Sequence, residues 1–248
     1  MDKKITPNEH GDIKIKSKFL EWCENFLYHY KWHTLIALFL IFTITVCSLQ
    51  TCQKSSYDIY IMYAGGTNVY GVPKEGEEDS LRDRIVTSSK KHIDDYDGDG
   101  KKSISFLSLF IPSPEELADM ENSEYFSNMV IENNTALGEY AYYGEFYICL
   151  LSERLFLSYS ERKDANPFAA IEHFMPDDAD GSEYVFANDF GIYLSSTKLA
   201  SLPGFSELSE DTVLCIRKYS SLGTRGSSKK SKAYYDFCSG VFSSMLEG

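Results

Sequence analysis

The chain has little positive charge and no local catalytic motif. Its 248 residues carry 24 Lys and Arg against 37 Asp and Glu, a net charge of −13. Nucleic-acid binding requires clustered Lys and Arg, so this balance argues against a nucleic-acid partner. The patterns GxSxG and HExxH do not occur, and beyond residue 56 the sequence has two histidines, His92 and His173. The sequence therefore favours a protein that is not an enzyme, although a spatial triad needs no local motif.

Cysteine is also scarce, with 6 residues in the chain. Cys149 and Cys215 lie in apolar runs typical of strands, and Cys238 lies on the apolar face of an expected helix. Cysteines scattered singly in this way favour small buried hydrophobic residues over a disulfide framework or a metal site. A bridge between Cys215 and Cys238 stays open as an alternative.

Residues 32–49 form an apolar run without acid, Lys, Arg, Gly or Pro. As a helix, this run is long enough to cross the hydrocarbon core of a bilayer. We therefore predict a tail at 1–31, a transmembrane helix at 32–50, a linker at 51–56 and a domain at 57–248. A cleaved signal peptide is the less favoured alternative, because more than thirty residues precede the apolar run. A lipoprotein site at Cys47 or Cys52 is disfavoured by the preceding Val46 and Thr51.

The lysines around this run predict its orientation. Six lysines precede it, whereas the first twenty residues after Leu49 contain only Lys54. Because excess Lys and Arg stay in the cytoplasm, we expect a single-pass protein of the cell membrane with its C-terminal domain outside. Residues 19–27 carry apolar positions at helical spacing, which predicts either an interfacial helix or an extension of the spanning helix.

The outer domain alternates between strand and helix patterns. Residues 1–54 hold seven Lys against five acids, so the remaining residues have a net charge of −15. The expected strands are 57–64, 102–111, 145–151, 183–194 with a break at 188–189, and 212–220. The expected helices begin near 77–79, at the capping box Ser113-Pro114-Glu115-Glu116, after Ser152 as N-cap, at 165–176 and at 229–246. This order predicts an α/β fold: an N-terminal transmembrane helix, then a three-layer domain with a mixed, mostly parallel sheet and helices on both faces.

Three short segments resemble a group of uncharacterised single-pass membrane proteins of Firmicutes. The segments are Tyr30-Lys31-Trp32-His33-Thr34, Tyr57-Asp58-Ile59-Tyr60 and Asp97-Gly98-Asp99-Gly100-Lys101. The stretch 138–156, which contains Gly144-Glu145-Phe146-Tyr147-Ile148, is also similar to part of the type II extracytoplasmic solute-binding proteins. The second resemblance covers at most one lobe and implies ligand binding without a second lobe that closes.

Residues 95–100, Asp-Tyr-Asp-Gly-Asp-Gly, have the spacing of a calcium loop. Asp95, Asp97 and Asp99 occupy positions 1, 3 and 5, and glycine at position 6 allows a sharp turn. Position 12 is Phe106 where a bidentate acid is expected, and a strand follows instead of a helix. The pattern therefore indicates an acidic turn between helix and strand, with weak calcium binding as the alternative; no other cofactor is expected.

The expected ligand crevice lies beyond the carboxyl ends of the strands, where open α/β sheets bind ligands. Its residues are Gly65, Gly66, Thr67, Ser113, Ser152 and Glu153. No phosphate-binding glycine motif accompanies them, so this hypothesis depends on their position alone.

Two charged segments remain. The acidic stretch 177–183 favours a solvated loop over a metal site, even with His173 nearby. Positive charge gathers at Arg217, Lys218, Arg225, Lys229, Lys230 and Lys232. This cluster indicates a charged loop, or else contact with lipid headgroups, wall polymer or an acidic partner.

The expected partners are thus the lipid bilayer and an extracytoplasmic protein or small-molecule ligand. The leading hypothesis is a membrane-tethered α/β module for binding or interaction outside the cytoplasm. A tethered extracytoplasmic enzyme and a structural subunit of a membrane complex are the alternatives.

Overall fold

The structure is a computed structural model, and it describes residues 4–7, 13–16, 18–52, 57–71, 79–120, 123–175, 184–220 and 228–247. Contacts between Cα atoms divide the chain into two compact units, Met1–Ser56 and Tyr57–Gly248.

The N-terminal unit contains a hairpin and one long helix. Strands β1 (Lys4–Pro7) and β2 (Ile13–Lys16) pair antiparallel, an element that the sequence patterns above did not predict. Helix α1 (Lys18–Cys52) has non-helical backbone angles at Tyr30, so two helical segments meet there at a kink. The interfacial helix and the extension of the spanning helix, the two alternatives for residues 19–27, both stay predictions.

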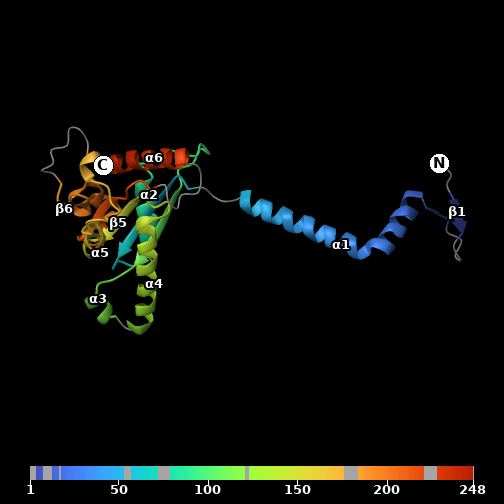
Figure 1. The fold of residues 1–248 in the computed structure, drawn as a ribbon, viewed down its shortest axis with the longest axis horizontal. Coiled ribbons are helices and arrows are strands. Elements are labelled where there is room, and N and C mark those ends of the chain that lie inside the picture. Colours follow the sequence, from blue (N-terminus) through green and yellow to red (C-terminus); the bar gives the residue numbers. More distant parts are fainter. Residues whose placement is uncertain are drawn as a thin grey trace. The chain divides into compact units, whose positions relative to one another are not determined.

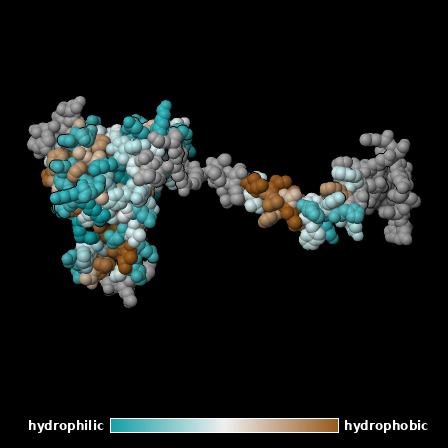
Figure 2. All heavy atoms as spheres, viewed as in Figure 1, coloured by the Kyte–Doolittle hydropathy of each residue, from teal (hydrophilic) through white to brown (hydrophobic). Residues whose placement is uncertain are grey.

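Within the described residues, α1 contains the one stretch that could cross a membrane. Tyr28–Val46 is 19 residues long, sufficiently apolar, and not buried within the protein. Figure 2 shows apolar residues over the later part of α1. Because a signal sequence near the N-terminus has the same properties, the structure supports either a membrane anchor or a signal sequence.

The C-terminal unit is an α/β domain around a six-stranded mixed sheet with the strand order β4-β3-β5-β8-β7-β6 (Figure 1). Its strands are β3 (Ile59–Gly65), β4 (Ile104–Phe110), β5 (Ile148–Ser152), β6 (Phe186–Asn188), β7 (Gly191–Tyr193) and β8 (Thr212–Ile216). Its α-helices are α2 (Leu81–Ser89), α3 (Pro114–Ala118), α4 (Ser123–Tyr142), α5 (Glu153–Ser160) and α6 (Ser228–Glu247). Its 3₁₀ segments are η1 (Ile171–His173), η3 (Leu194–Ser196), η4 (Lys198–Ser201) and η5 (Phe205–Glu207).

The expectation of a mostly parallel sheet is wrong. Strand β3 pairs parallel with β4 and with β5, but the pairs β5–β8, β7–β8 and β6–β7 are antiparallel. Parallel neighbours need a crossover connection, usually helical, and α2 and α4 supply two of them. After α5 no further α-helix precedes β8 in the described residues, so the chain returns through the β6–β7 hairpin and short 3₁₀ segments.

Two apolar clusters pack against opposite faces of the sheet. Alternating residues of β3 divide between them: Ile59, Ile61 and Tyr63 belong to one cluster, Met62 and Ala64 to the other. Helices α2 and α6 contribute to the first cluster, and α4 and α5 to the second. Figure 1 shows α6 at one end of the domain and α3 at the opposite end.

The helix expected at 165–176 is present only as the three-residue segment η1. Pro167 disfavours a helical conformation of the residue before it. The chain instead runs extended beside the end of β8, where Phe168 forms a bridge with Arg217 and the Ala169 N–H donates to the Ile216 carbonyl oxygen, 2.9 Å away. Tertiary pairing therefore overrides the local apolar pattern.

Candidate functional site

The carboxyl ends of β3 and β5 form the switch point of the sheet. From β3 the chain continues into α2, on the face of the first cluster, and from β5 it continues into α5, on the face of the second. Strand β4 follows α2, and strands β6, β7 and β8 follow α5. These two groups of strands lie on opposite sides of the β3–β5 pair. Connections that leave in opposite directions open a crevice at the strand ends.

A cavity of about 420 Å³ lies at this edge, and we call it the switch-point cavity. Four of the six expected crevice residues line it: Gly66, Thr67, Ser113 and Ser152. Six residues that the sequence hypothesis missed complete the lining: Tyr63, Ile111, Glu116, Arg154, Ser209 and Asp211. The structure thus brings together side chains from four separate connections.

Gly66 leaves room for the carboxylate of Glu116. A Cβ atom at position 66 would lie 2.8 Å from Oε2 of Glu116. The same Oε2 accepts the Ser113 N–H at 2.6 Å, and the Ser113 hydroxyl oxygen accepts the Glu116 N–H at 3.1 Å. The expected capping box is confirmed, and it holds Glu116 over the backbone of Gly66.

Tyr63 extends under the loop that follows β3. Its hydroxyl oxygen accepts the Thr67 N–H at 3.1 Å, which fixes the first turn of that loop. A Cβ atom at Gly65 would lie 2.5 Å from this hydroxyl oxygen, so Gly65 makes space for the ring and does not line the cavity itself. Burial raises the pKa of Tyr63, and the nearby carboxylates of Asp211 and Glu116 raise it further.

Ser152 directly precedes α5, but its side chain does not cap the helix. Ser152 occupies the N-cap position without a side-chain hydrogen bond to the first turn, which corrects the expected capping role. Its hydroxyl lines the cavity and makes no capping hydrogen bond. Next to it, Nη2 of Arg154 donates to the Pro112 carbonyl oxygen at 3.1 Å, which holds the guanidinium at the strand ends.

The carboxylate of Glu153 points to β7 and not into the cavity. It accepts the hydroxyl proton of Tyr193, and this hydrogen bond raises the pKa of Tyr193 to about 12. The Glu153 N–H donates to the carbonyl oxygen of Asp211 at 2.9 Å, which fixes the start of β8 beside the start of α5.

Ser209 and Asp211 reach the cavity because β8 runs antiparallel to β5. The beginning of an antiparallel strand lies at the edge where its parallel neighbours end. Strand direction is not encoded in the local pattern at 212–220, so no sequence signal could have placed these two residues here.

The acidic turn is confirmed as a turn held by its own carboxylates. The two carboxylate oxygens of Asp95 accept the N–H groups of Gly98 and Gly100, both at 2.7 Å. Asp97 accepts the N–H of Asp99 at 3.1 Å. Gly98 and Gly100 have φ angles of +78° and +82°, which favour glycine. These bonds explain the conformation without an ion, so calcium binding stays a prediction.

Asp58, which the calcium-loop hypothesis missed, completes the acidic group. Oxygen atoms of Asp58, Asp95 and Asp97 lie within 4.8 Å of one another, and Asp99 is not part of this group. Burial alone would raise the pKa of Asp58, but hydrogen bonds from Ser103, Tyr96 and Asp97 outweigh it and lower the pKa below its ordinary value.

Arg217 does not belong to the surface cluster of positive charge. It is 1% exposed, its guanidinium carbon lies 4.6 Å from the centre of the Tyr147 ring, and Nη2 donates to the Gly144 carbonyl oxygen. Burial lowers the pKa of Arg217. Lys218, Lys229, Lys230 and Lys232 are exposed, whereas Arg225 and the acidic stretch 177–183 lie outside the described residues.

The three cysteines of the C-terminal unit, Cys149, Cys215 and Cys238, are buried free thiols, which confirms the expected role as small hydrophobic residues. Cys215 lies opposite Cys149 in the β5–β8 ladder, so Cys238 is not its neighbour across the sheet.

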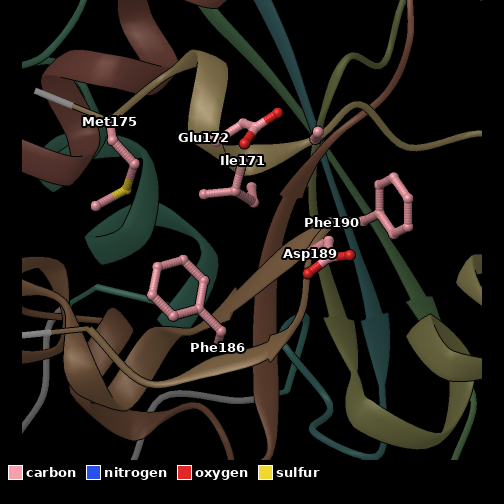
Figure 3. Close-up of a pocket in the computed structure, with 7 residues that line it drawn as sticks. Ile171, Glu172, Met175, Phe186, Asp189 and Phe190 are labelled. Carbon is pink, nitrogen blue, oxygen red and sulfur yellow. The ribbon is translucent and has the colours of Figure 1, made fainter. Parts of the chain in front are cut away.

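Two further cavities are mainly apolar. One, of about 600 Å³, has Ile171, Met175 and Phe186 with the carboxylates of Glu172 and Asp189 around it (Figure 3). The other, of about 700 Å³, is lined by β4 and α4 and includes Met120, Phe126 and Met129. Figure 2 shows apolar residues gathered at the α3 end of the domain, near this second cavity.

Comparisons with protein families, curated proteins and solved structures find no match for this chain.

Proposed function

We propose that this chain is a single-pass membrane protein whose extracytoplasmic α/β domain binds a small polar ligand in the switch-point cavity. Residues 32–50 are the uncleaved anchor and residues 1–31 the cytoplasmic tail. The apolar run and the excess of lysines before it support the anchor and its orientation. The expected three-layer arrangement is supported by the two apolar clusters on opposite faces of the sheet.

The observation that carries the ligand site is the convergence of polar groups from four connections on one cavity at the switch point. Carboxylates of Glu116 and Asp211, the guanidinium of Arg154, and hydroxyl groups of Tyr63 and Ser152 line it. Both signs of charge are present beside neutral donors and acceptors. Such a lining suits a ligand that is small, polar and rich in hydrogen-bonding groups. The resemblance to one lobe of solute-binding proteins supports the same proposal.

Thermal unfolding of the full chain in detergent, with a panel of sugars, amino acids and nucleosides at millimolar concentration, tests this site. A ligand present at 100 times its dissociation constant should add roughly 2.7 kcal/mol to the free energy of unfolding. Arg154→Gln should abolish the stabilisation, because the guanidinium lines the cavity. Arg82→Gln is the matched control, since Arg82 pairs with the exposed Asp83 and does not line the cavity. A stabilisation that survives Arg154→Gln would place the ligand elsewhere.

A structural subunit of a membrane complex is a second candidate, favoured by the apolar cavity beside β4. Strand β4 is at the edge of the sheet, and Phe110, Phe126 and Met129 line this cavity. Exposed apolar surface next to an edge strand is typical of association sites. Light scattering of the full chain in detergent, and cross-linking in native membranes, should then reveal a stable assembly that Phe126→Glu disrupts. A monodisperse monomer in both experiments would remove this candidate.

A further inference from the structure

The edge of the sheet opposite the switch-point cavity carries a network of aromatic rings. We call it the amino-terminal edge, because β3, β4 and β5 begin there. The network includes six rings that are linked by pairwise contacts: Tyr57, Tyr60, Tyr96, Phe146, Tyr234 and Phe237. Ring centroids in this network lie between 4.8 and 6.5 Å apart. Tyr57 is 39% exposed and Tyr96 is 41% exposed, so the network reaches the surface.

Most lysines of the domain lie at the same edge. Helices α2 and α5 run back from the carboxyl ends of β3 and β5, and β8 runs antiparallel to β5, so all three end at the amino-terminal edge. Nine of the ten described lysines beyond Tyr57 follow α2, follow α5, follow β8 or lie in the first turns of α6. Lys198 is the exception; its Nζ donates to the Glu247 carbonyl oxygen at the far end of α6. Nine lysines thus lie at this edge of a domain of net charge −15, while Arg82, Arg84 and Arg154 lie near the opposite edge.

Several carboxylates at this edge accept hydrogen bonds from the backbone. Those of Asp58, Asp95 and Asp97 accept backbone N–H groups. Asp97 and Asp94 are nevertheless exposed, so acids share this edge with the exposed Lys229 and Lys232. Lys218 is exposed as well, and its Nζ donates to the Asn166 carbonyl oxygen at 3.0 Å.

The linker keeps the first residue of the domain close to the bilayer in an anchored chain. Six residues separate the expected span at 32–50 from Tyr57, and even a fully extended chain of that length reaches about 25 Å. In an anchored chain Tyr57, at the amino-terminal edge, therefore stays within about 25 Å of the end of the span.

We propose that the amino-terminal edge docks on the lipid headgroups of the bilayer that holds the anchor. Tyr57 and Tyr96 lie at headgroup level, where amphipathic rings are favoured, and Lys229 and Lys232 contact lipid phosphates. This inference rests on the membrane anchor of the proposed function. It also directs the switch-point cavity away from the bilayer, open to ligands from outside.

Fluorescence quenching in vesicles tests the docking. Trp22 and Trp32 are the two tryptophans of the chain, so Trp22→Phe and Trp32→Phe together give a background without tryptophan. A single reporter is then introduced as Tyr96→Trp at the docking edge, or as Phe126→Trp near the opposite end as matched control. The full chain is reconstituted in phosphatidylcholine and phosphatidylglycerol vesicles with a nitroxide label on the headgroups. We expect roughly twofold quenching of the Tyr96→Trp reporter and little of the control, because only the first ring lies in the headgroup layer.

Charge reversal separates lipid contact from mere proximity. Lys229→Glu with Lys232→Glu should lower the ratio of docked to free domain by roughly fivefold or more per residue, whereas Lys198→Glu should leave it unchanged. Tyr57→Trp provides a second reporter if the Tyr96 variant does not fold, as judged by circular dichroism.

The outcomes distinguish the two proposals. A chain that does not float with the vesicles after an alkaline wash overturns the anchor. If the chain floats with the vesicles but the two tryptophan reporters are quenched equally, or neither is quenched, the docking proposal alone is overturned. Iodide in solution serves as a second quencher. If the Tyr96→Trp reporter is shielded from iodide but is not quenched by labelled lipid, a protein partner covers this edge, and the lipid-docking proposal is overturned.

Discussion

Asp58 is the side chain whose removal should cost the most stability outside the apolar core. It is fully buried at the start of β3, and its carboxylate joins this strand to the acidic turn. Oδ1 accepts the N–H groups of Tyr96 and Asp97 at 2.8 and 3.2 Å, and Oδ2 accepts the N–H and hydroxyl of Ser103 at 2.7 and 3.0 Å. Asp58→Ala leaves three backbone N–H groups without their acceptor.

Each lost acceptor costs about 1–3 kcal/mol, and because such losses are not additive we expect Asp58→Ala to lower the free energy of unfolding by about 3–5 kcal/mol. That corresponds to a decrease in Tm of roughly 10 °C for a domain of this size. Asp58→Asn keeps one oxygen for Tyr96 and Asp97 but presents an amide N–H₂ to the Ser103 N–H, so it should cost about 2 kcal/mol. Asp94→Ala is the control: its side chain is 97% exposed, and its removal should change stability by less than about 0.5 kcal/mol.

Thermal unfolding of the full chain in detergent, followed by circular dichroism between pH 3 and 7, measures both effects. The folded pKa of Asp58 lies below the ordinary value of 3.8, so its contribution is fully present above that pH. The contribution is lost as the pH falls through the folded pKa. The difference in Tm between the wild type and Asp58→Asn should therefore narrow as the pH is lowered toward 3. A difference in Tm that stays constant or widens in acid would refute this account of Asp58. Equal decreases in Tm for Asp58→Ala and Asp94→Ala would refute the burial of the Asp58 side chain.

Three further predictions concern the cavity, the turn and the topology. Gly66→Ala should displace the Glu116 carboxylate and lower the free energy of unfolding by about 1–2 kcal/mol in thermal melts, whereas Gly240→Ala, an open helical position, should raise it by up to about 1 kcal/mol. Calcium at millimolar concentration should raise Tm by a few degrees at most relative to chelator, and Asp97→Ala should remove that shift; coincident melts would exclude the ion. Protease added to cells without their wall should digest a C-terminal tag and spare an N-terminal one, and the reverse pattern would overturn the orientation.

The elements of the domain could be predicted because their signals are local. The capping box at Ser113 marked the start of α3, and the break expected at 188–189 marks the β6–β7 hairpin. The segment 165–176 was predicted wrongly because its conformation depends on pairing with the end of β8, a partner some fifty residues away. A local apolar pattern cannot contain that information.

The candidate site was predicted in part for the same reason. Gly66, Thr67, Ser113 and Ser152 follow strands directly, so the rule for strand ends was sufficient to place them. Asp58 was missed because its partners in the acidic turn lie about forty residues later in the chain. The short run Tyr57-Asp58-Ile59 offered one signal, since an acid within an otherwise apolar buried strand needs hydrogen-bond donors.

The direction of β8 links the cavity to the proposed docking edge. An antiparallel β8 begins beside the switch point, where Asp211 adds a carboxylate to the cavity, and ends at the opposite edge, where Lys218 is exposed. A parallel β8 would exchange these two positions and place the lysine at the cavity and the acid beside the bilayer. The antiparallel direction of β8 therefore places Asp211 at the cavity and Lys218 at the opposite edge, and both proposals draw on this one topological feature.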